Sequence, residues 1–314
     1  MIKCYQEFLR NEGVLNMAIR IVTDSASDLP KAVREKYPEI DVIPLVVLTD
    51  DGRELADGIE ITPLQVCDAM RENKVYKTSQ VTPERFQEAF EKYAAAGETV
   101  VYVGFSSELS GTVQSARLAV QMVQEEYPEA DITVIDTLCA SYGFGMVVER
   151  AAELVRRGVD KDTLIKTVEF YAKHQQHVFS VDDLEYLRRG GRVSNASAFL
   201  GGLLSIKPVL HVDAGKLIPI FKCRGHKKAM QKLVDLIKER GADADIKNQV
   251  IGITNSDCMD TVKEVEQMLT EQLGVTRFMV GDIGSVISCH TGPGTIALFF
   301  LDAWPEDPAL QVIK

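Results

Sequence analysis

The chain has 314 residues, of which 46% are hydrophobic and 26% are charged, and its formal net charge is -11. This length favours two hydrophobic cores over one, and the composition is that of a folded globular protein, not of a disordered or membrane-spanning one. The excess of negative charge disfavours nucleic acid as a partner, because the phosphate backbone would be repelled.

The first half of the chain alternates between predicted strands and helices. Strands are expected over residues 18–23, 41–48, 99–104 and 132–136, and helices begin at Pro63, at Pro83 and after Gly111. Thr62-Pro63-Leu64-Gln65 carries an N-cap hydroxyl, a proline at the first helical position and a glutamine at the third, and Thr82-Pro83 repeats the first two signals. We therefore expect an α/β domain over residues 17–176, preceded by an N-terminal extension of residues 1–16.

The second half shows the same rhythm after a predicted helix over residues 161–175. Strands are expected over residues 178–181, 208–212, 217–221, 250–254, 277–280 and 295–301, with helices over 227–239 and 259–273 between them. This predicts a second α/β domain over residues 177–314. The expected fold class is α/β, with two domains, each a sheet flanked by helices.

Several short polar clusters follow predicted strands, where an open α/β sheet presents its ligand crevice. Ser110 also stands at the start of a predicted helix, and the unpaired amides there favour an anion, with Gly111 allowing close backbone approach. A carboxylate would fit this position. The clusters are Thr23-Asp24-Ser25, Thr78-Ser79-Gln80, residues 106–112, Gly190-Gly191-Arg192, and residues 290–295.

Other kinds of site have weaker support in the sequence. A G-x-x-x-x-G-K-[ST] phosphate loop is absent, and Gly292-x-Gly294-x-x-Ala297 lacks the following βαβ unit that a dinucleotide fingerprint requires. His174 and His177 lie three residues apart on a predicted helix without a third ligand, so we expect surface histidines and no metal site. The six cysteines form no C-x-x-C pair and are expected to be buried free thiols, as in a protein of the reducing cytoplasm.

An enzyme is the main alternative function. Ser110 or Ser107 as nucleophile, His290 as base and Asp24 as orienting carboxylate would make a serine-dependent lipid hydrolase or acyltransferase. The chain has no G-x-S-x-G nucleophile elbow, and a serine that caps a helix beside an anion site needs no activation. No catalytic residue is therefore assigned.

The ordered set of motifs resembles the DegV family, which includes the FakB fatty-acid-binding partners of bacterial fatty acid kinase. The resemblance runs from about Ile19 to Leu301, and departs from the usual pattern at Val81 and at Cys289. Its motifs are T-D-S-A-S-D-L-P (23–30), T-S-Q (78–80), S-S-E-L-S-G-T (106–112), D-T-L-C-A-S-Y-G-F-G (136–145), D-D-L-E-Y-L-R-R-G-G-R (182–192), K-P-V-L (207–210), K-C-R-G-H-K-K-A (222–229) and H-T-G-P-G-T (290–295).

The resemblance implies a long-chain fatty acid bound between two domains, with no cofactor and no metal. Thr78, Ser110, Arg192 and His290 would hold its carboxylate. A carboxylate taken out of water needs charge-assisted donors of this kind. Supporting roles are expected for Asp24, Ser25, Gly111, Thr112, Thr291 and Gly292, and candidates for the apolar tunnel are Phe199, Leu200, Leu203, Leu204 and Ile206.

The resemblance also implies a protein partner, an ATP-dependent fatty acid kinase that converts the bound carboxylate to an acyl phosphate for phospholipid synthesis. The chain would then be a carrier that presents a substrate and would not itself be an enzyme. Two basic clusters are candidates for docking: Arg188, Arg189 and Arg192, and Lys222, Arg224, Lys227 and Lys228. We expect a cytoplasmic location with transient membrane contact at most, and an isoprenoid or other lipid acid is an alternative ligand.

Overall fold

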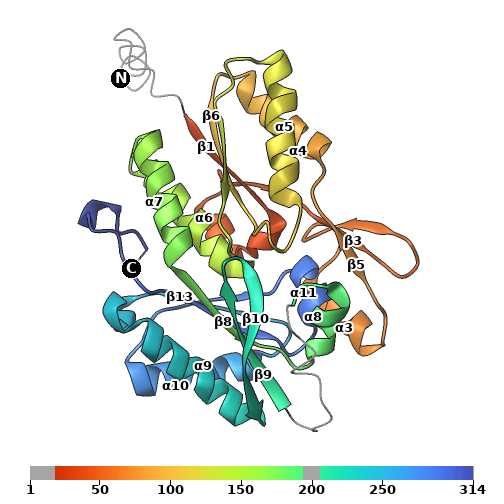
Figure 1. Ribbon diagram of the computed structural model, residues 1–314, viewed down its shortest axis with the longest axis vertical. Coiled ribbons are helices and arrows are strands. Elements are labelled where there is room, and N and C mark those ends of the chain that lie inside the picture. Colours follow the sequence, from red (N-terminus) through yellow and green to blue (C-terminus); the bar gives the residue numbers. More distant parts are fainter. Residues whose placement is uncertain (1–17, 194–205, 314) are drawn as a thin grey trace.

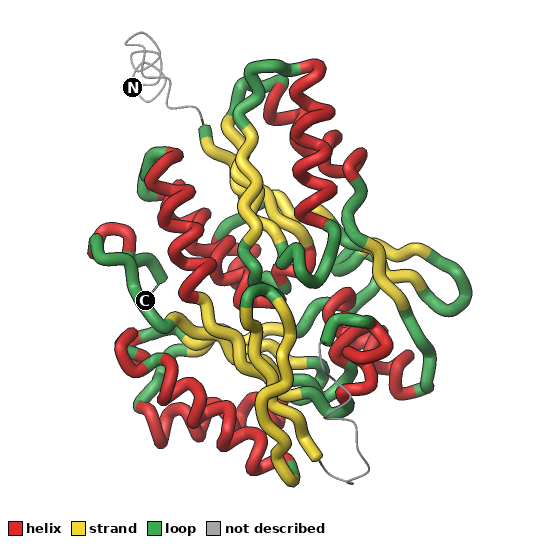
Figure 2. Tube along the Cα trace, viewed as in Figure 1, coloured by secondary structure: helices red, strands yellow, loops and turns green. Residues whose placement is uncertain are grey.

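The computed structural model describes residues 18–193 and 206–313, which form three sheets with helices packed around them (Figures 1 and 2). One sheet has four parallel strands in the order β2-β1-β6-β7. These are β1 (Ile19–Asp24), β2 (Asp41–Ile43), β6 (Thr99–Gly104) and β7 (Ile132–Asp136), and helices α4 (Pro83–Ala94) and α5 (Thr112–Glu126) contact β6 and β7 respectively.

The second large sheet has six strands in the order β10-β9-β8-β13-β11-β12, and only β11 and β12 pair in parallel. Helices α9 (His226–Arg240) and α10 (Met259–Leu273) cover it, as Figure 1 shows. Its strands are β8 (Gln175–Ser180), β9 (Ile206–Asp213), β10 (Lys216–Arg224), β11 (Ile251–Asn255), β12 (Phe278–Asp282) and β13 (Ile296–Leu301). The prediction of an α/β fold with helix-flanked sheets is confirmed.

A third, three-stranded sheet was missed by the sequence analysis. The strand expected over residues 41–48 is two strands, because Pro44 lacks the backbone N–H that would continue the ladder. The first part, β2, joins the parallel sheet, and β3 (Val46–Leu48) pairs antiparallel with β4 (Glu54–Ala56) and β5 (Lys77–Ser79). Helices α3 (Pro63–Arg71), α8 (Leu184–Gly190) and α11 (Ser285–Thr291) gather beside this sheet (Figure 1).

The helix starts expected at Pro63 and Pro83 are confirmed in detail. The side chain of Thr62 accepts from the amide of Gln65 and the Gln65 side chain accepts from the Thr62 amide, which is a complete capping box. Thr82 accepts from the amide of Arg85 in the same way. Apart from the helix over Ser141–Arg156, the remaining described elements are α2 (Lys31–Lys36), α7 (Lys161–His174) and four 3-10 turns, η1 (Ser25–Ser27), η3 (Ala242–Ala244), η4 (Ile246–Asn248) and η5 (Pro308–Leu310).

Helix α6 (Ser141–Arg156) lies between the two large sheets and contacts strands of both. It is buried on nearly every side, because it packs against strands of both sheets and against the 3-10 turn η1. Two glycines allow this packing. A Cβ atom on Gly143 would lie 2.3 Å from Nε2 of His177, and one on Gly145 would lie 2.2 Å from the carbonyl oxygen of Ser27.

The two large sheets are drawn from separate stretches of the chain, since the parallel sheet ends at Asp136 and the other begins at Gln175. On this basis we retain as a proposal the domain boundary expected near residue 176. The expected extension of residues 1–16 lies outside the described residues. None of the described helices has the length and apolarity needed to cross a membrane.

Candidate functional site

A cavity of about 530 Å³ lies between the two large sheets and beside α11. All four residues expected to hold a carboxylate line it: Thr78 on β5, Ser110 before α5, Arg192 after α8, and His290 on α11. The polar part of its lining also includes Ser79, Gln80, Thr82, Gly111, Ser141, His177, Thr291 and Thr295. The structure thus brings together four groups that are spread over more than 200 positions of the sequence.

Thr78 and His290 are in direct contact. The hydroxyl oxygen of Thr78 and Nε2 of His290 lie 2.8 Å apart and share one hydrogen bond. Nδ1 of His290 is buried without a hydrogen-bond partner among the described residues, and it faces Gly190, where a Cβ atom would lie only 2.3 Å away. The imidazole is therefore held from both sides at the cavity wall.

Arg192 is positioned by backbone carbonyls. Gly191 ends α8 in the left-handed conformation, with φ of 69°, and the next residue turns its side chain back across the helix end. Nη1 of Arg192 donates to the carbonyl of Gly190 at 2.6 Å, and Nε donates to that of Leu109 at 3.1 Å. A guanidinium group has five N–H donors, so others remain for a ligand.

The described part of the cavity lining contains no carboxylate, and Arg192 makes no ion pair with any described acidic residue. The half-buried guanidinium is therefore an uncompensated positive charge. Burial, assisted by the nearby charge of Arg192, lowers the pKa of His290 from 6.5 to about 4. The imidazole is therefore neutral at pH 7, and a bound anion would favour its protonation.

Ser110 is oriented by its neighbour Thr112. Their hydroxyl oxygens lie 2.8 Å apart, and the Thr112 amide donates to the Ser110 hydroxyl at 3.3 Å. Thr112 is buried and does not line the cavity, so its position is a supporting one. Gly111 was expected to let a ligand approach the backbone, but the space beside it is taken by Gln80, whose Oε1 would lie 2.1 Å from an added Cβ atom.

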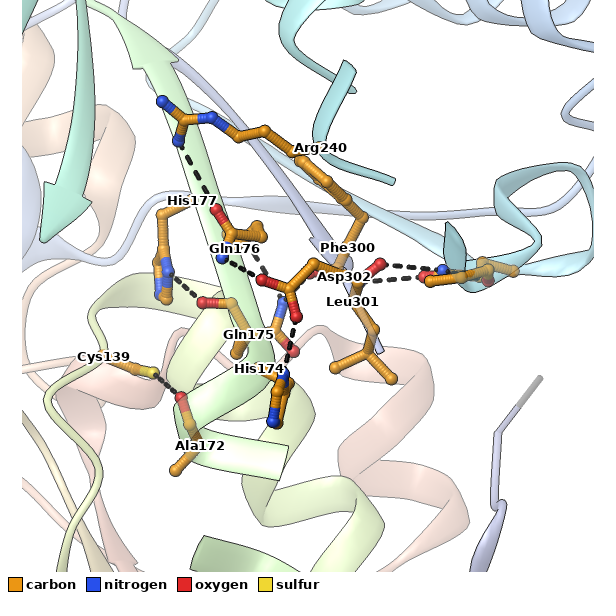
Figure 3. A network of polar contacts seen from close by, with 12 residues as sticks. Cys139, Ala172, His174, Gln175, Gln176, His177, Arg240, Phe300, Leu301 and Asp302 are labelled. Atoms are coloured by element: carbon orange, nitrogen blue, oxygen red, sulfur yellow. Dashed lines mark hydrogen bonds and ion pairs between the residues drawn. The ribbon is translucent and has the colours of Figure 1, made fainter. Parts of the chain in front are cut away.

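His177 is a lining residue that the sequence analysis missed. It was expected on the surface of a helix, but it lies on β8, is 3% exposed and lines the cavity together with Phe179. Figure 3 shows it with the carbonyl of Gln175, which lies 3.1 Å from Nδ1, while Nε2 accepts from the amide of Ala140 at 3.2 Å. Burial lowers its pKa to about 4, so this histidine is neutral.

His174, the other histidine of that pair, ends α7 and points away from His177 toward Asp302, with 2.7 Å between Nδ1 and Oδ1 (Figure 3). The two imidazoles therefore do not share a ligand. Within residues 18–193 and 206–313, no group of three histidine, cysteine or acidic side chains is arranged to hold a metal ion.

Asp24 and Ser25 do not line the cavity but support its wall from behind. The buried carboxylate of Asp24 accepts from the Tyr102 hydroxyl at 2.7 Å and from the Phe105 amide at 3.2 Å, and Phe105 lines the cavity. Burial raises the pKa of Asp24 to about 6. The hydroxyl of Ser25 accepts from the amide of Leu45, another lining residue, and donates to Asp57.

At the far end of α11, Thr291 lines the cavity but donates its hydroxyl to the carbonyl of Ile287 at 3.2 Å. Gly292 ends the helix, and the ring of Tyr186 packs against it. The segment from Gly292 to Ala297 thus runs from a helix into β13, the reverse of the strand-to-helix order in a dinucleotide fingerprint. That alternative is wrong.

Apolar side chains make up the rest of the cavity wall. Of the five tunnel candidates, Phe199, Leu200, Leu203 and Leu204 lie outside the described residues, and Ile206 on β9 is not part of the lining. The apolar lining instead comes from Leu45, Phe105, Leu109, Ala140, Phe179, Leu187, Val212, Leu217, Ile283, Val286, Ile287, Ala297 and Phe299.

The hydrolase alternative lacks its key contacts. The hydroxyl of Ser110 contacts Thr112, His290 contacts Thr78, and Asp24 is bonded to Tyr102 and to backbone amides. In the described part of the chain, no serine hydroxyl is hydrogen-bonded to an imidazole. Among residues 18–193 and 206–313, a serine nucleophile in contact with an activating histidine is therefore not assembled.

The cysteines and the basic clusters are arranged less uniformly than expected. Among the described cysteines, Cys67, Cys139 and Cys289 are buried free thiols, whereas Cys223 and Cys258 are half-buried.

Arg188 pairs with Glu185 on the surface at 2.6 Å, and Arg189 lies over the ring of Tyr186, while Arg192 turns into the cavity. The first basic cluster therefore has three separate environments.

Comparison with known proteins places this chain among relatives of similar length. A sequence model of the DegV family, described as uncharacterised proteins, matches residues 18–303. A DegV domain-containing protein of Clostridium perfringens is 40% identical over 285 residues, which is 90% of this chain and 96% of the relative.

Two solved structures are similar over the same extent. A DegV family protein from Thermus thermophilus described as binding fatty acid is 37% identical, with a TM-score of 0.79, over 90% of this chain and 99% of that one. DegV from Bacillus subtilis, described as a fatty acid binding protein, is 30% identical, with a TM-score of 0.78 and the same coverage. The chain belongs to the DegV family.

Proposed function

We propose that this protein binds a long-chain fatty acid in the cavity between its two large sheets, with the carboxylate held by Thr78, Ser110, Arg192 and His290. The observation that carries this proposal is the guanidinium of Arg192, which faces an apolar cavity without a described carboxylate to balance it. A charge in such surroundings is costly unless a counter-ion arrives with the ligand. The fatty acids bound by the Thermus and Bacillus relatives support the choice of anion.

The head group would be held by a chain of donors. If Nε2–H of His290 donates to the Thr78 oxygen, the Thr78 hydroxyl hydrogen is released toward the carboxylate. Ser110, oriented by Thr112, and the remaining N–H groups of Arg192 complete the surround. Hydrogen bonds to a charged group are worth about 1.5–3 kcal/mol each, so removing one of them should be measurable.

The acyl tail would occupy the apolar part of the cavity. Its volume, about 530 Å³, lies in the range of roughly 300–1,000 Å³ that is typical of small-molecule sites. Each methylene group removed from water contributes about 0.8 kcal/mol, so a long chain supplies most of the binding free energy and the head group supplies orientation. An isoprenoid acid would satisfy the same head-group contacts.

We further propose that the protein acts in a FakB-like role, as a carrier that is not itself an enzyme and presents the carboxylate to an ATP-dependent fatty acid kinase. Arg224, Lys227 and Lys228 are exposed at the junction of β10 and α9, where a partner could reach them. In this account, ATP and the loaded protein yield acyl phosphate only when the kinase is added, and Arg224→Ala with Lys228→Ala lowers its rate of formation. An unchanged rate in that double variant would remove these two residues from the docking surface.

The carboxylate assignment is tested by titrating delipidated protein with a long-chain fatty acid. Ser110→Ala should weaken binding about tenfold, and Arg192→Ala by about 10- to 100-fold, because the latter removes the charged donor. Arg188→Ala is the matched control, since this neighbour on α8 is exposed and paired with Glu185. Equal affinities in all four proteins would contradict the proposed site.

A further inference from the structure

A further cavity, of about 670 Å³, is lined by residues of the two edge strands β2 and β12, by helix α2 and by the loop before α3. We call it the edge cavity. None of its described lining residues lines the cavity proposed for the fatty acid. Much of its wall comes from the motif T-D-S-A-S-D-L-P (23–30), which supports the proposed fatty acid site only from behind.

Two buried carboxylates belong to the lining of the edge cavity, Asp28 at 7% exposed and Asp57 at 5%. Both oxygens of Asp57 are satisfied, by the amide of Ser285 and the hydroxyl of Ser25. Asp28 differs, because Oδ2 accepts from the hydroxyl of Ser141 at 2.5 Å, whereas Oδ1 is buried without a hydrogen-bond partner among the described residues. Native structures leave few buried acceptors in this state, since it is costly.

The unpartnered oxygen of Asp28 lies where a hydrogen-bond donor with positive charge would be stabilised. A Cβ atom on Gly284, another lining residue, would lie 2.2 Å from Oδ1 of Asp28 and 3.7 Å from Oδ2 of Asp57, so the two carboxylates are close to each other. Burial, together with the charge of Asp57, raises the pKa of Asp28 well above its ordinary value, and a cation bound beside it would oppose that rise. An ammonium group carries three N–H donors and suits such a place.

Arg34 brings the opposite charge to the same cavity. It is exposed on α2, it lines the edge cavity, and it makes no ion pair with any described acidic residue. Lys31, three residues earlier on the helix, also lines the cavity but pairs with Glu35 at 3.7 Å. The cavity therefore offers one carboxylate oxygen and one guanidinium group, each without a described partner, and its complement is a molecule that carries both charges.

We propose that the edge cavity binds a small zwitterion of the α-amino acid type, with its ammonium group held by Asp28 and its carboxylate held by Arg34. A guanidinium group binds a carboxylate through two parallel hydrogen bonds. The volume of about 670 Å³ lies in the range of roughly 300–1,000 Å³ that is typical of small-molecule sites. This second site does not depend on the fatty acid proposal, since the two cavities are lined by different described residues.

The test begins with ligand-observed NMR of the full chain in mixtures of the twenty protein amino acids, followed by calorimetric titration of each amino acid that binds. Each is compared with its N-acetyl derivative, which lacks the ammonium group, and with its amide, which lacks the carboxylate. We expect at least one amino acid to bind, and both of its derivatives to bind about tenfold more weakly or worse. Derivatives that bind as tightly as the amino acid, or the absence of any bound amino acid, would overturn the proposal.

Two variants locate the site, and each should raise the Kd of the amino acid about tenfold or more. Asp28→Asn keeps the shape of the side chain and tolerates the left-handed φ of 44° at this position. Arg34→Gln changes an exposed side chain, so it keeps the proposal testable even if Asp28→Asn fails to fold.

Arg53→Gln is the control, because this exposed arginine pairs with Asp51 at 2.9 Å and does not line the edge cavity. It should leave the Kd of the amino acid unchanged. If Arg34→Gln also left the Kd unchanged, the amino acid would bind elsewhere and the proposed site would be wrong.

Discussion

Gly190 shows how closely single residues determine the geometry of the proposed head-group site. The main chain at this position lies against Nδ1 of His290, and an added Cβ atom would come within 2.3 Å of it. We expect Gly190→Ala to push the imidazole away from Thr78 and weaken fatty acid binding about tenfold, the value of one good hydrogen bond to a charged group. Titration with fatty acid measures the effect.

A double-mutant cycle provides the control for this prediction. Once His290→Ala has removed the ring, the methyl group at position 190 has room, so the double variant should bind as well as His290→Ala alone. Additive losses of affinity would show that Gly190→Ala acts through something other than the imidazole.

The two buried histidines give the protein a measurable pH signature. His177 and His290 should titrate near pH 4, because burial disfavours their charged forms. NMR titration of the imidazole carbons in protein without ligand measures both values. A pKa near 6.5 for His290 would contradict its burial, and a bound fatty acid should raise the pKa of His290 more than that of His177.

These pKa values also set the direction of a stability change. Between pH 6.5 and 4 the unfolded chain binds protons that the folded histidines do not, so each histidine lowers the unfolding free energy as the pH falls. Asp24, with its pKa raised to about 6, acts in the opposite direction between pH 6 and 3.8. Comparing His290→Gln with the parent isolates the contribution of this one histidine. As the pH is lowered from 6.5 to 4, the unfolding free energy of the variant should fall less than that of the parent.

At the scale of elements, helix α11 carries His290 and is tied to the first half of the chain through Asp57. This buried carboxylate accepts from the amide of Ser285 at 3.1 Å and from the hydroxyl of Ser25 at 2.8 Å. Asp57→Ala would leave both donors unpaired, so we expect a loss of about 2–3 kcal/mol in unfolding free energy and faster hydrogen exchange of the α11 amides. Chemical denaturation and exchange mass spectrometry measure the two effects.

Asp51→Ala is the matched control for Asp57→Ala. Asp51 lies in the turn between β3 and β4, is exposed, and pairs with Arg53 at 2.9 Å. Surface pairs of this kind contribute little, so stability and α11 exchange should stay near the parent values. If Asp57→Ala behaved like this control, the hydrogen bonds of Asp57 to Ser25 and Ser285 would not be what holds α11 in place.

Elements with local signals could be predicted from the sequence, and elements determined by tertiary packing could not. The caps at Thr62 and Thr82 identified α3 and α4, and runs of β-branched residues identified β1 and β6. Helix α6 carries two glycines, which lower its intrinsic helix propensity, and tertiary packing buries it on nearly all sides. Helix α11 has only seven residues and reads as a loop after a strand.

The same limit applies to the site. The sequence predicts His177 on the surface of a helix. In the structure α7 ends at His174 and β8 begins at Gln175. The alternation of side chains along β8 places His177 and Phe179 on the face that lines the cavity. Thr78 and His290 are 212 residues apart, so no spacing rule could pair them. They were joined in one prediction only through the resemblance to a family.

At the scale of the whole molecule, ligand binding should be coupled to stability, because the cavity is lined by both large sheets. A fatty acid at 100 times its Kd should add about 2.7 kcal/mol to the unfolding free energy and raise the midpoint of thermal unfolding by several degrees. Arg192→Ala at the same ligand concentration should show a smaller rise. Calorimetry that gave equal rises for both proteins would argue against a role of Arg192 in binding.

The most direct test of the account is organic extraction of the purified protein followed by mass spectrometry of the extract. We predict long-chain fatty acids in near-equal molar amount to the parent protein, because an acyl chain in the cavity would be kept from water and Arg192 would hold its carboxylate. Arg192→Ala should retain much less. If the parent protein yields no long-chain acid, and retains none after incubation with one, the proposal that it binds a long-chain fatty acid is contradicted.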